Sequence, residues 1–176
     1  KTIPIIMTGP ADPVAAGLVA SLARPGGNIT GLAIISHELV GKELELLREV
    51  VPKVSRVAVL WNPANPGNVP QLRAAEAAAR ALGLRLQPLG ARGASEIDRA
   101  FVAMTRERAG ALLVLLDGVL LDQRGMIADL AAKNRLPAVY GLRRHAEAGG
   151  LMAYGANLLD MSRCAASYVD RILRGA

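Results

Sequence analysis

The sequence has few aromatic residues and a single cysteine. Trp, Phe and Tyr make up 3% of the 176 residues, so Ala, Leu, Val and Ile must fill the core. The lone Cys164 excludes an intrachain disulfide and a zinc site built on cysteine pairs, and its helical surroundings predict a small buried residue. No apolar run approaches the ~18 residues of a transmembrane helix. A 52% share of apolar residues is typical of helices packed on a parallel sheet.

The amino-terminal residues show no signal peptide. Lys1 leads directly into the apolar run Ile3–Met7, without the basic segment and longer apolar segment that such peptides have. We therefore expect either a cytoplasmic protein or a processed or trimmed piece of a longer one. The absence of an initiator Met favours a piece.

The basic character of the chain does not take the form that nucleic-acid binding requires. The formal net charge is +6, but the basic residues are scattered, and Arg143 and Arg144 form the one adjacent Arg pair. No basic run reaches five residues, and no aromatic residues are interleaved for stacking on bases. We predict no nucleic-acid partner.

Catalytic and cofactor motifs are also missing. The sequence contains no G-x-G-x-x-G, no phosphate-binding G-x-x-x-x-G-K-[ST] and no G-x-S-x-G. His37 and His145 have no neighbours at metal-ligand spacing, and His145 is predicted to be a surface residue. The sequence therefore predicts a protein that is not an enzyme and has no cofactor and no metal site.

Apolar runs alternate with helical periodicity along the chain. Such alternation predicts parallel β/α units, that is, an α/β fold with parallel sheets flanked by helices. Arg56–Trp61 and Ala111–Leu116 are the most continuous apolar runs, so we expect them to be neighbouring central strands. The other expected strands are Ile3–Met7, Ile29–Ile35, Leu84–Leu89, Pro137–Tyr140 and Leu151–Tyr154. The expected helices are 13–22, 38–50, 71–82, 95–108, 122–134 and a last helix after Asn157.

Polar and aromatic residues follow several of these expected strands. In an open parallel sheet, ligands bind beyond the carboxyl ends of the strands. A small polar ligand needs hydrogen-bonding groups and aromatic walls, and the loops at these ends supply both. The candidate ligand-binding residues are Thr8, Asp12, Trp61, Asn62, Asn65, Asp117, Tyr140, Tyr154 and Asn157.

Structural roles explain several of these candidates equally well. Asp12 and Asn157 stand where a helix N-cap is expected. The candidates Asn62 and Asn65 are also common turn residues, and Trp61 and Tyr154 suit a core. Asp117 ends an entirely apolar strand and precedes Gly118, so a ligand contact explains it better than a cap does.

Three stretches carry a resemblance to a known family. They are LARPGGNITG at residues 22–31, RVAVLWNPANP at 56–66 and AGGLMAYGAN at 148–157. Together they resemble the tryptophan/tyrosine-type ABC transporter substrate-binding proteins, and the resemblance extends over almost the whole chain. One departure is Leu116, where the family pattern leads us to expect Pro before the Asp.

The resemblance implies a periplasmic-binding-protein type I-like fold, in which two lobes of Rossmann-like parallel sheets flanked by helices have a ligand cleft between them. Residues 1–30 and 143–176 would belong to lobe one, and 31–142 to lobe two. The first β/α units of lobe one would be missing, which leaves lobe one incomplete.

The resemblance also implies a function. The protein would capture a small organic solute, for example an amino acid, outside the cytoplasmic membrane and deliver it to an ABC permease. It would be periplasmic or anchored as a lipoprotein. Two alternatives stay open from the residues alone, namely a ligand-sensing regulatory domain of the same fold and a small α/β enzyme.

Overall fold

The chain divides into two compact units in a computed structural model that describes residues 3–9, 12–14 and 16–175. Unit 1 comprises Lys1–Ile35 and Ala156–Ala176, and unit 2 comprises Ser36–Gly155. These units are described one at a time below. Lobe one is expected at 1–30 and 143–176 and lobe two at 31–142. These bounds differ from those of the two units, and the lobes stay a prediction.

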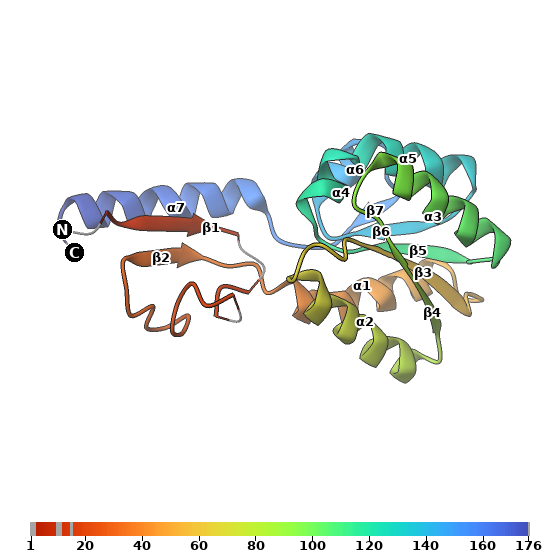
Figure 1. The fold of residues 1–176 in the computed structure, drawn as a ribbon, viewed down its shortest axis with the longest axis horizontal. Coiled ribbons are helices and arrows are strands. Elements are labelled where there is room, and N and C mark those ends of the chain that lie inside the picture. The colour runs from red at the N-terminus through yellow and green to blue at the C-terminus, as the bar shows by residue number, and fades with distance from the viewer. Residues whose placement is uncertain (1–2, 10–11, 15, 176) are drawn as a thin grey trace. The chain divides into compact units, whose positions relative to one another are not determined.

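Unit 2 is built on a parallel five-stranded sheet with the order β4-β3-β5-β6-β7 (Figure 1). Its central strands pair in parallel, with Val57 opposite Ala111 and Leu60 opposite Val114. This confirms the predicted parallel sheet and the neighbouring central positions of the two most apolar runs. The strands are β3 (Arg56–Trp61), β4 (Arg85–Gly90), β5 (Ala111–Val114), β6 (Ala138–Tyr140) and β7 (Met152–Ala153).

Helices cover both faces of this sheet, as Figure 1 shows. One face carries α1 (Ser36–Val50) and α2 (Asn68–Leu82). The other carries α3 (Ala94–Arg106), α4 (Gly118–Asp122) and α5 (Arg124–Lys133), while α6 (Arg143–Glu147) packs against α5 and β7. No helix of the described residues is both long and apolar enough to cross a membrane.

Alternation along the strands divides the buried side chains between two cores. Val57 and Val59 of β3 pack with α1 and α2, whereas Ala58 and Leu60 pack with α3, α4 and α5. This period of two follows from the pleat of a strand, which points successive side chains to opposite faces. Complete burial of each Val or Leu contributes roughly 1.5–3 kcal/mol, so both layers stabilise the same sheet.

Unit 1 is smaller and contains β1 (Ile5–Thr8), β2 (Ile29–Leu32) and α7 (Leu158–Leu173). The two strands pair in parallel, and α7 packs against both. Gly31 has φ +132° and lies so close to β1 that a Cβ there would be 2.2 Å from the Met7 carbonyl oxygen. The glycine that ends LARPGGNITG is therefore required by the approach of these two strands.

The expected helix over 13–22 is wrong for the described part of that segment. Residues 12–14 and 16–22 form turns, bends and irregular backbone, and the Ala16 N–H donates to the Asp12 carbonyl. Gly17 has φ +68°, a left-handed conformation that ends the turn. A second correction concerns Cys164, which is exposed, while its neighbour Ala165 is buried.

Candidate functional site

Asp117 is the centre of a hydrogen-bonded cluster at the carboxyl ends of β3 and β5. Its carboxylate accepts from Asn62 Nδ2 at 3.3 and 3.2 Å, from Asn65 Nδ2 at 2.8 Å and from the Leu120 backbone N–H at 3.0 Å. Only 5% of Asp117 is exposed. The structure thus brings together three of the candidates, and it also gives Asp117 the N-cap role on α4.

Two further buried polar residues, Asn68 and Gln71, attach the start of α2 to the end of β5. Gln71 accepts from the Leu116 N–H at 3.0 Å and donates to the Leu116 carbonyl at 3.1 Å. Asn68 donates to the same carbonyl at 2.8 Å and accepts from the Asn62 N–H at 2.8 Å. We call Asn62, Asn65, Asn68, Gln71 and Asp117 the strand-end cluster.

Sequence reasoning missed Asn68 and Gln71 because their partner lies far away in the chain. The helix was expected to begin at Gln71, whereas α2 begins at Asn68. That extra turn places both side chains against Leu116, more than forty positions later in the sequence. The density of Asn in the preceding loop was the one signal available, and it indicated only a turn.

The three aromatic candidates lie in different environments. Trp61 is half-buried against the core formed with α1 and α2. Tyr140 is completely buried, and burial raises its pKa to about 12. Tyr154 is 40% exposed, and its backbone N–H donates to the Tyr140 carbonyl at 2.9 Å. Of the three, Tyr154 offers the most side-chain surface to a solute.

His145 is buried rather than exposed, so the predicted surface position is wrong. It is 2% exposed and stacks on Tyr140 with ring centroids 4.8 Å apart. Neither ring nitrogen has a hydrogen-bond partner in the described residues, and burial lowers the pKa of the imidazole. The aromatic contact, which brings α6 onto β6, accounts for this burial.

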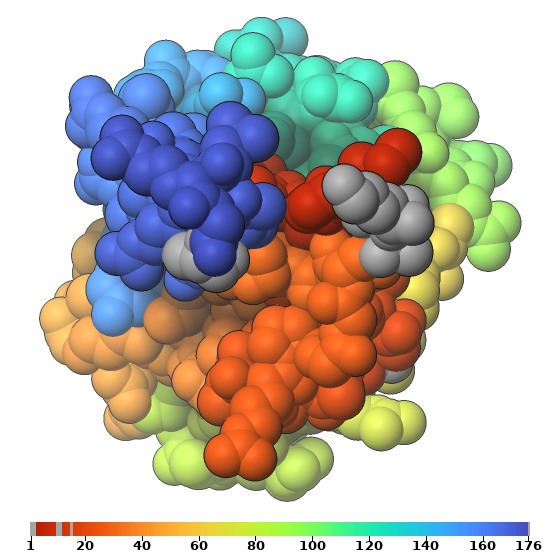
Figure 2. Space-filling model, turned by 90° about the vertical axis from the view of Figure 1, so that its left-hand side faces the viewer, coloured from red at the N-terminus to blue at the C-terminus, as the bar shows by residue number. Residues whose placement is uncertain are grey.

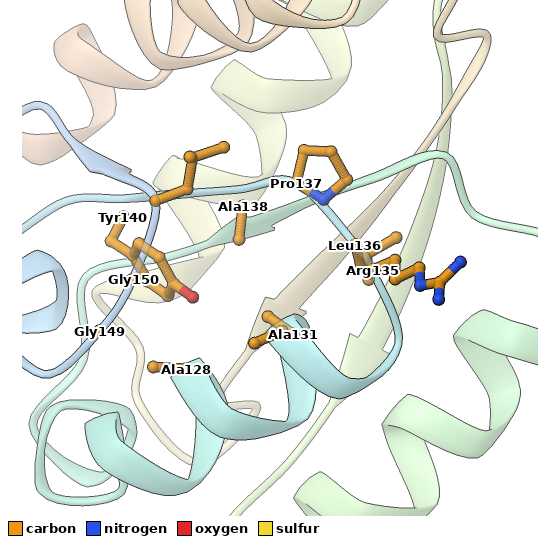
Figure 3. Close-up of a pocket in the computed structure, with 11 residues that line it drawn as sticks. Ala128, Ala131, Arg135, Leu136, Pro137, Ala138, Tyr140, Gly149 and Gly150 are labelled. Carbon is orange, nitrogen blue, oxygen red and sulfur yellow. The ribbon is translucent and has the colours of Figure 1, made fainter.

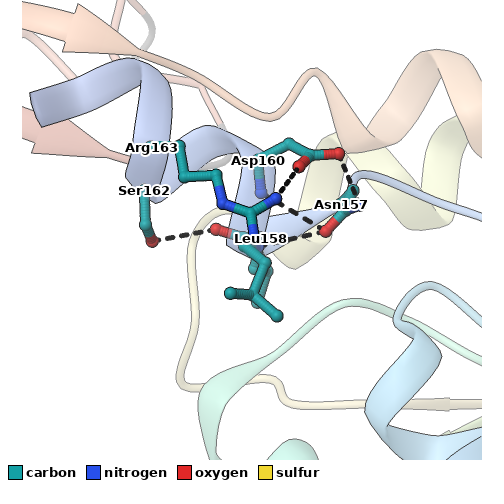
Figure 4. A network of polar contacts seen from close by, with 6 residues as sticks. Asn157, Leu158, Asp160, Ser162 and Arg163 are labelled. Atoms are coloured by element: carbon teal, nitrogen blue, oxygen red, sulfur yellow. Dashed lines mark hydrogen bonds and ion pairs between the residues drawn. The ribbon is translucent and has the colours of Figure 1, made fainter. Parts of the chain in front are cut away.

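The remaining candidates lie in unit 1. Thr8 is exposed at the end of β1. Asp12 is partly buried and accepts from the Val14 N–H at 3.2 Å. Asn157 caps α7 by accepting from Leu159 N–H at 3.1 Å, and it donates to Asp160 Oδ2 at 2.6 Å (Figure 4). The N-cap role expected for Asn157 is therefore present, and ligand contact by these three residues stays a prediction.

A separate cavity of about 260 Å³ opens near the amino ends of β6 and β7 (Figure 3). Its walls come from Ala128 and Ala131 of α5, the segment 135–138 and the Gly149–Gly150 loop. Small apolar side chains and glycines dominate this lining, and Arg135 is its charged residue. Since ligands of open parallel sheets bind beyond the carboxyl ends of strands, the edge that carries the strand-end cluster is the better candidate.

The strand-end cluster is suited to binding rather than to covalent chemistry. Its side chains are amides and one carboxylate, which donate and accept hydrogen bonds. Among the described residues, no three His, Cys, Asp or Glu side chains are grouped to hold a metal ion.

Comparison with known proteins identifies relatives. The tyrosine-binding protein of Clostridioides difficile strain R20291 is 27% identical over 175 residues, which cover 99% of this chain and 50% of that protein. A conserved domain protein from Vibrio cholerae has a similar structure, with 28% identity and a TM-score of 0.90 over 100% of this chain and 58% of that one.

The ligand-free, open structure of a substrate binding protein with adhesive properties from Clostridium difficile is also similar. It shares 28% identity and a TM-score of 0.72, over 100% of this chain and 59% of that one. The chain thus spans about half the length of the curated relative it matches. The sequence profile of the ABC transporter substrate binding proteins matches residues 1–176. Because that match extends over the whole chain, the chain belongs to the family of ABC transporter substrate binding proteins.

Proposed function

We propose that this chain is part of the extracytoplasmic solute-binding component of a bacterial ABC importer, and that its solute is an amino acid. The observation that carries the proposal is the family match over residues 1–176. Substrate-binding proteins of ABC transporters are extracytoplasmic and bind small solutes. The amino acid is suggested by the relative from Clostridioides difficile, which is named for tyrosine binding. An ABC permease in the membrane is the partner that this role requires.

The strand-end cluster supports this function through its position and its rigidity. It stands at the carboxyl edge of a parallel sheet, where ligands of such folds bind. Asp117 fixes the amides of Asn62 and Asn65, so the loop after β3 is ordered before any solute arrives. A preordered site loses less conformational entropy on binding. Trp61 and Tyr154 are the aromatic candidates for the apolar part of the solute.

The proposed mechanism is capture by closure of two lobes around the solute. The bound solute would favour the closed state because it contacts both lobes only in that state. With the lobe bounds expected from the sequence, the candidates Trp61, Asn62, Asn65, Asp117 and Tyr140 would act from lobe two. Thr8, Asp12, Tyr154 and Asn157 would act from lobe one. No turnover is expected, because members of the family are binding proteins.

Calorimetric titration of the complete natural protein that contains this chain tests the proposal. L-tyrosine and L-tryptophan should bind, whereas glucose and spermidine should give no heat of binding. A protein that binds neither amino acid but binds a sugar would contradict the amino-acid assignment. Incubation with esters, phosphoesters and nicotinamide cofactors should give no reaction above background.

A further inference from the structure

Glu43 is a buried carboxyl group without a partner. It lies on the inner face of α1 beside Val40, Leu44 and Leu47, and 4% of the residue is exposed. Among the described residues it makes no hydrogen bond and no ion pair. An isolated buried carboxylate is costly, so a structural role does not explain this residue.

The carboxyl group of Glu43 lies at the same edge of the sheet as the strand-end cluster. A Cβ on Gly141 would be 3.4 Å from Glu43 Oε1 and 3.5 Å from Leu116 Cβ. Gly141 directly follows β6, and Leu116 directly precedes Asp117. The Glu43 oxygen therefore lies beyond the carboxyl ends of β5 and β6, where the solute is proposed to bind.

The carboxyl group of Glu43 is not completely buried. Among the described residues, the completely buried polar side-chain atoms that lack a hydrogen-bond partner are Ser36 Oγ, Gln87 Oε1 and the two ring nitrogens of His145. The oxygens of Glu43 are not among them although they have no partner, so the carboxyl group retains a small exposed area.

Asp117, the other buried carboxylate of this edge, is already satisfied. A carboxylate offers about four lone pairs, and Asp117 accepts four hydrogen bonds, two from the Asn62 amide and one each from the Asn65 amide and the Leu120 N–H. A cation could join it only by displacing one of these donors. Glu43 has all of its acceptor capacity available.

We propose that Glu43 binds the ammonium group of the solute and restricts the protein to solutes that carry one. The inference rests on the proposed function, since it assigns one contact of the same site. A solute without an amino group would leave the buried carboxyl group unpaired, and this difference is the source of selectivity.

The protonation of Glu43 links binding to pH. Burial raises the pKa of Glu43 to about 8, so the empty site holds a neutral carboxyl group at pH 7. An ammonium group favours the carboxylate, and binding should therefore release roughly one proton at pH 7. Affinity should rise between pH 6 and pH 8.

Burial is the single cause of this raised pKa, and no neighbouring charge contributes to it. The ionisable residues on α1 itself are His37, Glu38, Lys42, Glu45, Arg48 and Glu49. Those on α2 and β6, which pack against it, are Arg73, Glu76, Arg80 and Tyr140, while β5 has none. Asp117 and Tyr154 follow β5 and β7 at the same edge of the sheet. The proton released on binding is thus assigned to Glu43.

The test is calorimetry on the complete protein at pH 7 with two probes. L-tyrosine carries the amino group, and 3-(4-hydroxyphenyl)propionate is the same molecule without it. The wild type should prefer tyrosine by roughly ten- to hundred-fold, the value of a hydrogen bond to a charged group. Glu43→Gln should bind both probes with similar affinity, whereas the control Glu45→Gln on the exposed face of α1 should keep the preference.

Proton release on tyrosine binding provides a second readout, which can be measured on the wild type and on Glu43→Gln. Titrations of the wild type with tyrosine in two buffers of different ionisation enthalpy should show the release, and Glu43→Gln should show none. Tyrosine binding without proton release, or an unchanged preference in Glu43→Gln, would overturn the role of Glu43 and leave the proposed function intact. A wild type that binds neither probe nor any other amino acid would overturn both.

Discussion

Two buried carboxyl groups at one edge of the sheet are stabilised in opposite ways. Asp117 accepts hydrogen bonds from several donors, while Glu43 has none and lies beside the buried Val40, Leu44 and Leu47 of α1. Burial without donors favours the neutral form of the Glu43 carboxyl group. The same residue class therefore serves two purposes here, one that orders loops and one that is proposed to recognise a cation.

The raised pKa of Glu43 predicts how the stability of the empty protein changes with pH. Burial raises the pKa of Glu43 from its ordinary value of 4.5 to about 8, so the folded state holds the proton more tightly. The stabilisation is complete below pH 4.5 and is lost as the pH rises from 4.5 through 8. In urea unfolding between pH 5 and pH 9, the midpoint of the wild type should fall more than that of Glu43→Gln.

Other shifted groups do not obscure this comparison. Burial lowers the pKa of His145, so its contribution is lost as the pH falls below 6.5, in the opposite sense. Burial raises the pKa of Tyr140 to about 12, which affects stability above pH 10. Both effects are shared by the wild type and the variant. Parallel midpoints for the two proteins over the whole range would contradict a neutral Glu43.

We predict that Asp117→Asn lowers the stability of the protein even without a solute. The new amide would place a donor where Asn62, Asn65 or Leu120 now donates, so at least one buried donor would lose its acceptor. We expect the free energy of unfolding to fall by about 1–3 kcal/mol. The matched control is Asp122→Asn, at the exposed end of α4. Equal urea midpoints for both variants would show that the cluster does not stabilise the fold.

Some of these residue roles could be predicted from sequence and others could not. A polar loop after β3 and an Asp after β5 were visible because turn residues interrupt apolar runs. The partners of Asp117 were not visible, because hydrogen bonds between loops depend on tertiary structure. The role of Glu43 was not visible either, because the pattern of this amphipathic helix does not indicate that one of its acidic residues faces inward.

At the scale of elements, continuous apolar runs were a sound guide to strands, whereas an apolar helical face alone was not a sound guide to a helix. β3 and β5 were placed correctly because complete burial needs a continuous apolar run. The short α6 was missed, since one helical turn with few apolar residues gives no periodic signal. The segment 13–22 has an apolar face, but Gly17 and the Pro25-Gly26 pair favour turns there.

The contact between α2 and β5 predicts an effect of changing Gln71. Gln71→Leu removes the acceptor of the Leu116 N–H and leaves that partly buried donor without a partner. We expect a loss of about 1–3 kcal/mol in the free energy of unfolding. Arg73→Leu introduces the same side chain on the exposed face of α2 and should change it by less than about 0.5 kcal/mol. If urea unfolding shows similar small changes for both, the link between α2 and β5 is not stabilising.

At the scale of the whole molecule, the two units differ in how much core they contain. Both core clusters of buried residues lie in unit 2. Unit 1 has few buried apolar side chains among its described residues, and several large ones are exposed, including Leu18, Leu22, Leu159 and Leu173. Figure 2 shows the surface of α7 in blue and of the segment before β2 in orange. Apolar burial is the main stabilising term, so the two units should differ in local stability.

Amide hydrogen exchange of the intact chain tests this difference. Amides of β3 and β5 lie in the middle of a sheet covered on both faces, so they should exchange only through unfolding of unit 2. Amides of β1 and β2 belong to a two-stranded sheet and should exchange through smaller openings, several kcal/mol lower in free energy. Mass spectrometry of peptides at pH 7 would measure both. β4, at the edge of the larger sheet, serves as the internal control and should be intermediate. Equal protection of β1, β2, β3 and β5 would mean that unit 1 unfolds together with unit 2, and that its exposed apolar residues do not weaken it.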